Sequence, residues 1–419
     1  MSDLFFISYS LKRGGAAIAA SRLHRVATET VMSNESINSI TQDKAGILQF
    51  TKRLISFSLN KLQFDGNPIK HSLNLFSYRP VLKAFEKHKK NVFNIHWVNN
   101  DTLSIFDFDK IPPGSVVTLH DEWLYCGSEH CYKINEQNLD FIHGYTFFKK
   151  GVWGIHWNYI IWKIKFKKLY CRPDLIYTVP SKWMLSRATQ SLMLKNADVR
   201  LLPNAIDVDK FSPSSQVDVN AFRCSIGLSQ DDIIFAYGAA NGITNQLKGH
   251  YLLDEALRIL SAEDEKLMQR VKFVNFGGKY KEEAKIHGFI NISVSTISDA
   301  SKLALLYSSV DCVVVSSLVE SFGQIAAEAL SCGTPVICYS CTGLTDIVID
   351  GKTGLTAKPY SAFDLSEKLK EMILMDKSRR KHLGKNGREH VVREFSYRYI
   401  SIIYANIIND AFELAAKYR

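Results

Sequence analysis

Short apolar runs of strand length alternate with longer stretches of helical periodicity throughout the chain. In the first half, the runs typical of buried strands lie at 4–9, 92–97, 115–119, 175–179 and 199–202. Helical periodicity intervenes, notably at 16–30 and 81–88. Strands that alternate with helices predict a mostly parallel sheet with helices on its faces.

The second half repeats this alternation. Its predicted strands lie at 233–237, 271–276, 312–316 and 336–339, and its predicted helices at 251–261, 301–308, 322–330 and 362–375. A last stretch, 397–418, carries apolar residues at helical spacing. The composition changes abruptly at 203–217 (PNAIDVDKFSPSSQV), and 419 residues exceed one ordinary core. We therefore expect an α/β protein of two doubly wound, Rossmann-like domains that face a central cleft, with ligands at the carboxyl ends of the strands.

Composition fits an ordinary globular protein, with 46 % hydrophobic and 22 % charged residues. The N-terminal MSDLFFISYS lacks the pattern of a secretory signal, and no run approaches the roughly 20 apolar residues of a membrane-spanning helix. We expect a cytoplasmic location with reduced cysteines. The absence of an export signal also argues against a periplasmic sugar-binding protein.

The net charge of +10 suggests an acidic partner, and one source of it is local. Residues 141–172 contain seven Lys or Arg and no Asp or Glu, interleaved with Trp and Tyr. Within 157–168, Trp157, Ile160, Ile161 and Ile164 share one helical face, away from Lys163. Two interpretations stay open for the stretch 149–170: an interfacial helix on the anionic inner face of the cytoplasmic membrane, or an ordinary helix packed on its own sheet.

Two carboxylates frame the most informative segment, ESFGQIAAEAL, which follows the apolar run DCVVVSSLV. Glu320 and Glu328 are separated by seven residues, and Ser321 is the predicted N-cap of the helix 322–330. If Glu320 directly precedes that cap, the carboxylates lie about 12 Å apart at about 1.5 Å per residue. Such a pair suits the sugar and the ribose of a nucleotide-sugar, whose diphosphate faces the helix N–H groups.

The segment 320–335 resembles the E-x7-E signature of retaining glycosyltransferases of family GT4, which have the GT-B fold. The resemblance is strongest over 233–395. It implies an acceptor-side domain at 1–205, a nucleotide-sugar domain at 206–395, and a last helix at 396–419 that crosses back to the first domain. It also implies a hexosyltransferase that retains anomeric configuration and needs neither a metal nor another cofactor.

In this family a Lys-Gly pair neutralises the donor diphosphate, and Lys248-Gly249 matches it. The Arg that usually precedes it is absent, because Gly238 is followed by Ala239, Ala240 and Asn241. The family also implies that Gly14-Gly15, after the first strand, line the donor-sugar side of the site. The remaining expected donor contacts are Glu320, Ser321, Phe322, Gly323 and Glu328, with Glu320 positioning the sugar and Glu328 holding the ribose.

Polar residues also end two predicted strands of the first half. His120 and Asp121 follow 115–119, and His96 lies within 92–97. Together with Trp123, Gly127 and Cys131-Tyr132, they resemble family members that build bacterial surface polysaccharides such as O-antigen, lipopolysaccharide or capsule. We expect His120 to join Glu320 and Lys248 as a catalytic residue near the reacting carbon, with His96 and Asp121 on the acceptor side.

The expected reaction moves a sugar from a UDP- or GDP-linked donor to a saccharide acceptor, which we expect to be polyprenyl-diphosphate-linked. Asp107-Phe108-Asp109 mimics the D-x-D metal motif of another glycosyltransferase fold, and we interpret it as unrelated to metal binding. Two alternatives stay open: a GT-B-fold UDP-sugar epimerase, and a basic protein that binds nucleic acid or membrane. No nucleic-acid motif appears, so we expect no nucleic-acid partner.

Overall fold

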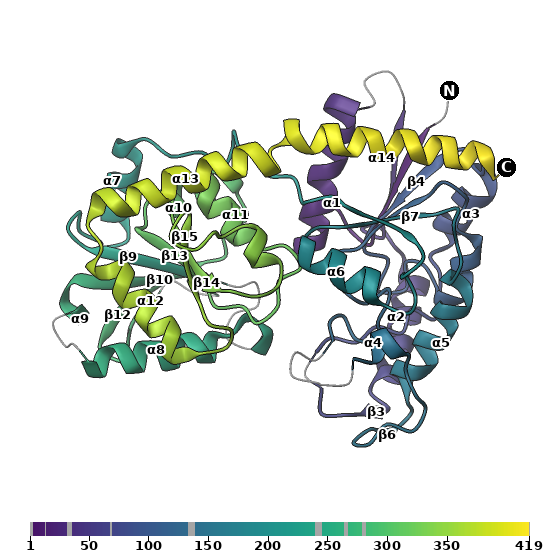
Figure 1. Ribbon diagram of the computed structural model, residues 1–419, viewed down its shortest axis with the longest axis horizontal. Coiled ribbons are helices and arrows are strands. Elements are labelled where there is room, and N and C mark those ends of the chain that lie inside the picture. The colour runs from purple at the N-terminus through teal and green to yellow at the C-terminus, as the bar shows by residue number, and fades with distance from the viewer. Residues whose placement is uncertain are drawn as a thin grey trace. The chain divides into compact units, whose positions relative to one another are not determined.

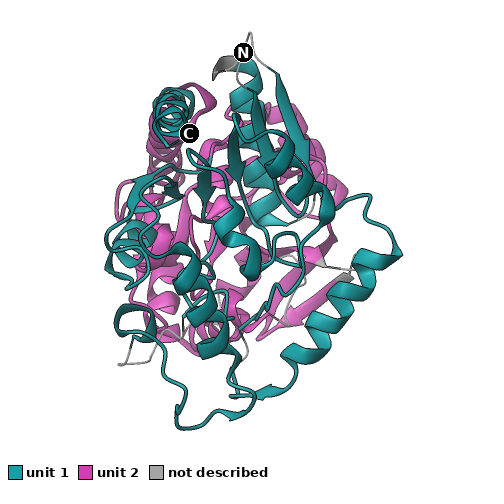
Figure 2. Ribbon diagram, turned by 90° about the vertical axis from the view of Figure 1, so that its right-hand side faces the viewer, with its two compact units in different colours: residues 1–204, 400–419 teal, residues 205–399 magenta. Residues whose placement is uncertain are grey.

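The computed structural model describes residues 3–12, 14–31, 36–67, 69–132, 139–238, 245–263, 267–278 and 282–418. The chain divides into two compact units, coloured separately in Figure 2. Unit 1 comprises Met1–Asn204 and Ile400–Arg419, and unit 2 comprises Ala205–Tyr399. Each unit is a sheet covered by helices (Figure 1).

Unit 1 is built on a six-stranded parallel sheet with the order β2-β1-β4-β5-β7-β8. Its strands are β1 (Leu4–Ile7), β2 (Ile37–Ile40), β4 (Val92–Ile95), β5 (Val116–Thr118), β7 (Ile176–Val179) and β8 (Asp198–Leu201). The chain moves from β1 outward to β2 on one side and through β4 on the other. The strand order therefore reverses between β1 and β4, where parallel sheets usually bind ligands beyond their carboxyl ends.

The helices of unit 1 are α1 (Gly15–Val26), α2 (Ile47–Asn60), α3 (Arg79–Lys87), α4 (Asp140–His143), α5 (Trp157–Leu169), α6 (Lys182–Gln190) and the part of α14 (Tyr397–Lys417) beyond Tyr399. A π-helical turn, Ala27–Val31, follows α1. A 3₁₀ helix, Ile105–Lys110, precedes β5. Short strands β3 (Gln63–Phe64) and β6 (Trp153–Gly154) pair antiparallel apart from the main sheet.

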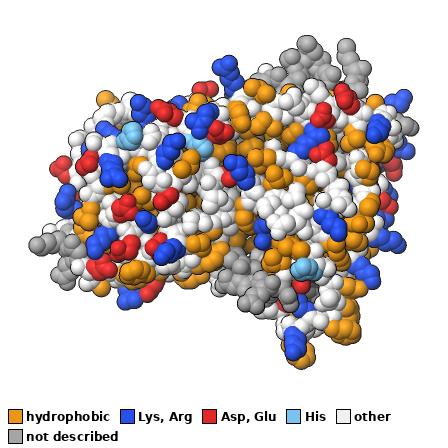
Figure 3. Space-filling model, viewed as in Figure 1, with side chains coloured by type: hydrophobic (Ala, Val, Ile, Leu, Met, Phe, Trp, Pro, Cys, Tyr) orange, Lys and Arg blue, Asp and Glu red, His pale blue; other side chains and the backbone are white. Residues whose placement is uncertain are grey.

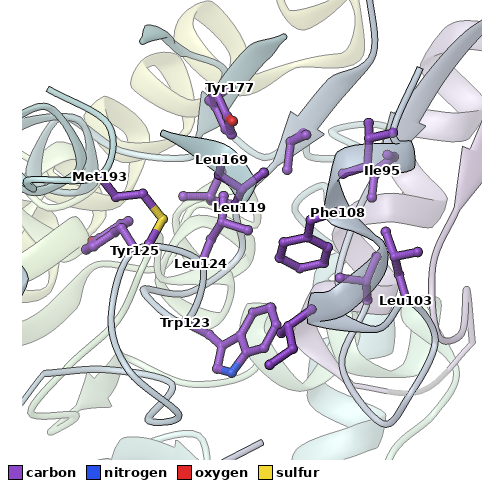
Figure 4. Packing of buried hydrophobic residues seen from close by; sticks show 14 of the residues in the cluster. Ile95, Leu103, Phe108, Leu119, Trp123, Leu124, Tyr125, Leu169, Tyr177 and Met193 are labelled. Carbon is purple, nitrogen blue, oxygen red and sulfur yellow. The ribbon is translucent and has the colours of Figure 1, made fainter. Parts of the chain in front are cut away.

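The core of unit 1 lies between this sheet and the helices on it. Figure 4 shows aliphatic and aromatic side chains from strands, helices and loops meeting in it, among them Ile95, Leu119, Trp123 and Tyr177. Helix α5 closes part of this core, because Ile161 is fully buried and Trp157 and Ile164 pack against the same cluster.

The interfacial interpretation of this segment needs a free apolar face over 157–168, and α5 does not present one. Its apolar side chains face the core of unit 1. Even Lys165 is fully buried, and its Nζ donates to the carbonyl oxygens of Trp123 and, at 2.7 Å, Gly127. The packed helix, the second of the two interpretations of this segment, is the one that the structure supports.

Unit 2 is built on a seven-stranded sheet with the order β11-β12-β10-β9-β13-β14-β15, parallel except for β11. Its strands are β9 (Ile233–Gly238), β10 (Val271–Gly278), β11 (Glu282–Ile286), β12 (Phe289–Ser295), β13 (Cys312–Val315), β14 (Val336–Tyr339) and β15 (Gly354–Ala357). Its helices are α7 (Gln216–Ser225), α8 (His250–Glu263), α9 (Leu267–Arg270), α10 (Ala300–Ser308), α11 (Gln324–Ser331), α12 (Ala362–Leu374) and α13 (Lys377–Phe395).

Alternate residues of the unit 2 strands belong to two separate cores, one on each face of the sheet. Ile234 and Ala236 of β9 pack in one cluster, and Phe235 in the other. Strand β9 pairs with β10 on one side and with β13 on the other. The order of this sheet therefore reverses at β9, next to β13.

Among the described residues, no helix is long and apolar enough to span a membrane.

Candidate functional site

The candidate site of unit 2 lies where the strand order of its sheet reverses. Lys248 is in the segment that follows β9, and Glu320 is in the loop that follows β13. These two strands are parallel neighbours, with Val314 opposite Tyr237. Their carboxyl ends therefore bring together two segments that are 72 residues apart in sequence.

Backbone contacts fix the Lys248 segment against the end of β13. Lys248 closes a short 3₁₀ helix, Gln246–Lys248, and Gly249 follows in the left-handed region with φ 65°. A Cβ atom at Gly249 would lie 2.0 Å from the carbonyl oxygen of Ser316, so only glycine fits there. The Ser316 hydroxyl donates to the Lys248 carbonyl oxygen at 3.0 Å, and the Leu318 N–H donates to that of Leu247 at 2.8 Å.

Glu320 and Lys248 form an ion pair in which Nζ lies 2.5 Å from Oε1. The Ser317 hydroxyl donates to the same carboxylate oxygen at 2.8 Å. The backbone of Glu320 is held by Thr342, whose hydroxyl accepts from the Glu320 N–H at 3.2 Å, and by the Gly343 N–H, which donates to the Glu320 carbonyl oxygen at 2.8 Å. Both charged side chains are partly exposed, so a ligand can reach them.

Helix α11 begins at Gln324, two residues later than predicted, and its N-cap is Gly323. The prediction that Ser321 caps this helix is therefore wrong. Gly323 has φ 110°, and a Cβ there would lie 2.7 Å from Cδ2 of Leu344. Because Glu320 lies in the preceding loop, the separation of about 12 Å, which assumed that it directly precedes the helix, does not apply.

The two remaining donor-site candidates of this segment are buried. The Phe322 side chain is 2 % exposed and packs edge-on against Phe395, with ring centroids 5.3 Å apart. Glu328 is 6 % exposed on α11, with the Tyr307 hydroxyl 3.5 Å from its Oε2. Phe322 can thus serve a ligand only through its backbone, whereas a ligand of Glu328 must reach a buried carboxylate on α11.

The sequence analysis missed Ser317 and Thr342, which hold Glu320 in place. Both follow the carboxyl end of a strand of this sheet, β13 for Ser317 and β14 for Thr342. A hydroxyl residue just beyond a predicted buried strand was the available signal for each.

In unit 1 the structure brings His96 and His120 together at the ends of β4 and β5. Nδ1 of His96 lies 3.0 Å from Nε2 of His120, and the rings stack with centroids 5.3 Å apart. Burial, followed by the charges of His120 and His24, holds the pKa of His96 well below its ordinary value. Burial lowers the pKa of His120 to about 4, against the effect of Asp121. Both rings are therefore neutral at pH 7, and one N–H donates across the pair.

Asp121 is bound by three donors from its own unit. Its Oδ2 accepts from Nε1 of Trp97 at 2.9 Å and from Nδ1 of His130 at 2.7 Å, and its Oδ1 accepts from the Trp123 N–H at 3.1 Å. Burial raises the pKa of Asp121, but the His130 charge and these hydrogen bonds outweigh it, so the pKa lies below its ordinary value. The carboxylate holds the loop after β5 in shape.

Gly14 and Gly15 stand at the start of α1, after β1. Gly14 has φ 93° and is the N-cap, and no heavy atom lies within 4 Å of a Cβ built at either position. The structure therefore leaves open space beside the backbone at both glycines.

The Asp107 and Asp109 carboxylates lie in the 3₁₀ helix of unit 1 and pair with lysines. Asp107 lies 2.8 Å from Nζ of Lys110, and Asp109 lies 2.5 Å from Nζ of Lys168. Within the described ranges, no group of three or more His, Cys, Asp or Glu is placed to hold a metal ion. Residues 239–244, where the family's Arg is missing, lie outside the described residues.

Nearly the whole chain resembles solved GT-B glycosyltransferase structures. The match to the structure of Anabaena HepE in complex with UDP-glucose covers 98 % of this chain and 100 % of HepE, with a TM-score of 0.64 and 14 % sequence identity. The match to WaaG, a glycosyltransferase involved in lipopolysaccharide biosynthesis, covers 97 % of this chain and 99 % of WaaG, with a TM-score of 0.59 and 14 % sequence identity. Together with the two α/β units, these matches show that the chain has the GT-B fold.

Residues 229–390, within unit 2, match the family described as "Glycosyl transferases group 1". A D-inositol 3-phosphate glycosyltransferase of Stackebrandtia nassauensis is 27 % identical over 229 residues, which cover 52 % of this chain and 50 % of the relative. The chain thus spans about half the length of the curated relatives it matches. Lys248 and Glu320 both lie within the residues that match the glycosyltransferase group 1 family.

Proposed function

We propose that this protein transfers a hexosyl group from a nucleoside-diphosphate sugar to an acceptor hydroxyl, with retention of configuration and without a metal. The observation that carries the proposal is the Lys248–Glu320 pair at the strand-order reversal of unit 2. It lies inside the segment that matches the glycosyltransferase group 1 family. The fold shared with HepE, which binds UDP-glucose, supports a nucleotide-sugar donor.

In this proposal Lys248 supplies positive charge to the diphosphate, where negative charge develops as the sugar leaves. In the structure its Nζ is 2.5 Å from Glu320, so the ammonium is already held in place by a carboxylate. The N–H groups at the start of α11 favour the same anion. The leaving phosphate oxygen then takes the proton of the acceptor hydroxyl, while Glu320 orients the transferred sugar and Glu328 holds the ribose.

For unit 1 we propose that His120 contacts the transferred sugar, with Gly14 and Gly15 also on the donor side. His96 and Asp121 serve the acceptor. The neutral His96–His120 pair offers a hydrogen-bond donor or acceptor without placing a positive charge there.

The finer proposal is a saccharide acceptor carried on a polyprenyl diphosphate, used in building a surface polysaccharide. The similarity to WaaG in fold and the polar residues after β4 and β5 support it. The name of the Stackebrandtia relative points instead to a phosphorylated cyclitol, so an acceptor panel needs both classes. Contact of 149–170 with an anionic membrane is part of this proposal, through its exposed residues such as Trp153.

The first test is thermal stabilisation by UDP, GDP, ADP and their sugars without added metal. A ligand at 100 times its Kd stabilises by about 2.7 kcal/mol, and only one nucleotide class should give this shift. Release of the nucleotide is then followed with each acceptor class.

Two variants test the assigned roles. Glu320→Ala should nearly abolish turnover, because loss of one preorganised group typically costs about 10²–10³ in rate. Glu328→Gln, which keeps the volume of the buried side chain, should mainly raise the donor KM. Small and equal effects of both would contradict the assignment, and epimerised donor without transfer would reject the transferase.

A further inference from the structure

A cavity of about 740 Å³ lies in unit 2, away from the Lys248–Glu320 pair. Asp311 and Pro335, which directly precede β13 and β14, line it. These two strands are parallel, so the cavity lies at their amino ends. Glu320 follows the carboxyl end of β13, so the cavity and the candidate donor site lie at opposite edges of one sheet. The volume is that of an ordinary small-molecule site.

The lining of this cavity carries mostly positive charge. Seven Lys or Arg line it, six from α13 and the seventh, Arg223, from α7. Two acidic residues, Asp311 and Glu389, line it as well. Lys and Arg side chains are exposed along α13 in the space-filling view (Figure 3). We call this space, with its basic lining, the α13 cavity.

Both acidic residues of the lining already have cationic partners. Oδ2 of Asp311 lies 3.3 Å from Nη2 of Arg223, and its Oδ1 lies 3.6 Å from Nη2 of Arg380. Oε1 of Glu389 lies 4.0 Å from Nζ of Lys385. The remaining basic side chains therefore leave an excess of positive charge at the cavity, which an anionic ligand can balance.

Three lysines form a row along the cavity side of α13. Lys377, Lys381 and Lys385 follow one another at a spacing of four residues, and all three line the cavity. Like charges at this spacing repel one another and destabilise a helix. Among the described residues, the ammonium groups of Lys377 and Lys381 have no ion-pair or hydrogen-bond partner. The row extends over about 12 Å, at about 1.5 Å per residue, which is longer than a single phosphate group.

Arg380 adds an unpaired donor at the wall of the cavity. Its side chain is 7 % exposed, and its Nη1 donates to the Met372 carbonyl oxygen at 3.4 Å. Its Nε is buried and has no hydrogen-bond partner among the described residues. A buried donor without an acceptor costs free energy, and a phosphate oxygen in the cavity would supply the acceptor.

Close packing holds α13 in place beside the cavity. A Cβ atom at Gly384 would lie 1.8 Å from the carbonyl oxygen of Gly333, and one at Gly387 would lie 2.5 Å from Cδ2 of Leu330. Helix α13 therefore lies directly on α11 and on the turn that follows it. The basic row is thus carried by a fixed helix, which lowers the cost of ordering it around a ligand.

We propose that the α13 cavity binds a small soluble molecule that carries two or more phosphate groups. The phosphates accept from the lysine row, while the amide side chains of Asn220 and Gln230, which also line the cavity, bond hydroxyl groups of the same molecule. A nucleic-acid strand is a poorer occupant, because none of the described residues that line the cavity is aromatic and could stack on a base. This site does not depend on the proposed sugar transfer.

Calorimetric titration with inorganic triphosphate, in buffer without metal ions, tests the proposal. The titrated protein is the full chain with Lys248→Met, which removes the cation of the proposed donor site. We expect triphosphate to bind in this background at least about tenfold more tightly than inorganic phosphate. Each additional charge-assisted hydrogen bond corresponds to about that factor in affinity.

Two pairs of lysines separate the effect of the cavity from that of net charge. Adding Lys377→Gln/Lys381→Gln should weaken triphosphate binding by at least about tenfold. The matched control, Lys285→Gln/Lys302→Gln, makes the same change in net charge on β11 and α10, outside the cavity lining, and should leave binding unchanged. All four lysines are exposed, so urea unfolding of both variants should match that of the parent.

Three results would overturn the proposal. Loss of triphosphate binding in Lys248→Met alone would place the probe in the donor site and leave the α13 cavity without a ligand. Equal losses in the two lysine pairs would show that net charge, not the cavity, attracts the anion. A single-stranded oligonucleotide that binds more tightly than triphosphate, and is lost in Lys377→Gln/Lys381→Gln, would assign the basic row to nucleic acid. Failure of sugar transfer would leave the expected binding unchanged, so the two proposals fail separately.

Discussion

Gly249 offers a direct test of how the backbone holds Lys248 at the site. We compare Gly249→Ala with Gly351→Ala, because both glycines belong to unit 2 and have nearly equal left-handed φ values, 65° and 67°. A Cβ at Gly351 meets no heavy atom within 4 Å, whereas one at Gly249 would lie 2.0 Å from the Ser316 carbonyl oxygen. The two variants share the backbone strain and differ in the contact with the end of β13.

The structure sets how much more unfolding free energy Gly249→Ala should lose than Gly351→Ala. Left-handed alanine costs about 1–2 kcal/mol, which is the whole effect expected at Gly351. At Gly249 the backbone must also move by more than 1 Å to reach the roughly 3.4 Å of an ordinary contact. That movement breaks the two hydrogen bonds that join this segment to Ser316 and Leu318, each contributing about 0.5–1.5 kcal/mol. We expect a total cost of about 2–5 kcal/mol.

Urea unfolding of both variants measures the stability difference, and calorimetry with the stabilising nucleotide measures its functional consequence. Gly249→Ala should lose nucleotide affinity as Lys248 is displaced from Glu320, while Gly351→Ala should keep it. If the two variants unfold alike and bind alike, the close packing of Gly249 on Ser316 does not position Lys248, and the reasoning fails.

Three further outcomes are expected. A double-mutant cycle with Glu320→Gln and Lys248→Met should give a coupling free energy of unfolding of about 1–2 kcal/mol for this partly buried pair, and near-zero coupling would contradict the ion pair. Ser321→Ala should change stability by less than about 0.5 kcal/mol, whereas Gly323→Ala should cost about 2 kcal/mol or more, because Gly323 is the N-cap at φ 110°. The pKa of His120, lowered from 6.5 to about 4, means that the unfolded chain binds more protons between these values. Stability should therefore be complete above about pH 6.5 and fall by up to about 3 kcal/mol on acidification to pH 4, a loss that His120→Gln should reduce in urea titrations.

The regular elements with strong apolar patterns were predictable from the sequence. Nine of the parallel strands match predicted runs, because a buried strand needs a nearly continuous apolar run whatever its neighbours are. The parallel strands β2, β12 and β15 were not predicted. Helix α13 was not predicted, since its sequence KSRRKHLGKNGREHVVREF is dominated by charged and polar residues. Helix α2 was also missed, and no local pattern could show that its apolar side faces outward.

The candidate site was likewise predictable from the sequence only in part. Sequence motifs selected Lys248, Glu320 and His120, but the pairing of Lys248 with Glu320 depends on β9 and β13 being neighbours in the sheet. Helix α11 starts at Gln324 rather than at Phe322, after a left-handed Gly323 at which a Cβ atom would lie 2.7 Å from Cδ2 of Leu344. Leu344 lies beyond the next strand, so the local sequence does not show this close approach.

The sequence by itself thus determined the α/β class, most strands and the candidate site residues, because these follow from local hydrophobic period and residue type. Only the tertiary structure decided which of those residues meet, which polar side chains of α2 are buried and which apolar ones are exposed. Those outcomes depend on strand order and on single hydrogen bonds such as Ser56 to Asp101, between residues 45 positions apart. Each such hydrogen bond contributes about 1 kcal/mol and joins residues far apart in sequence, so it produces no periodic pattern from which it could be predicted.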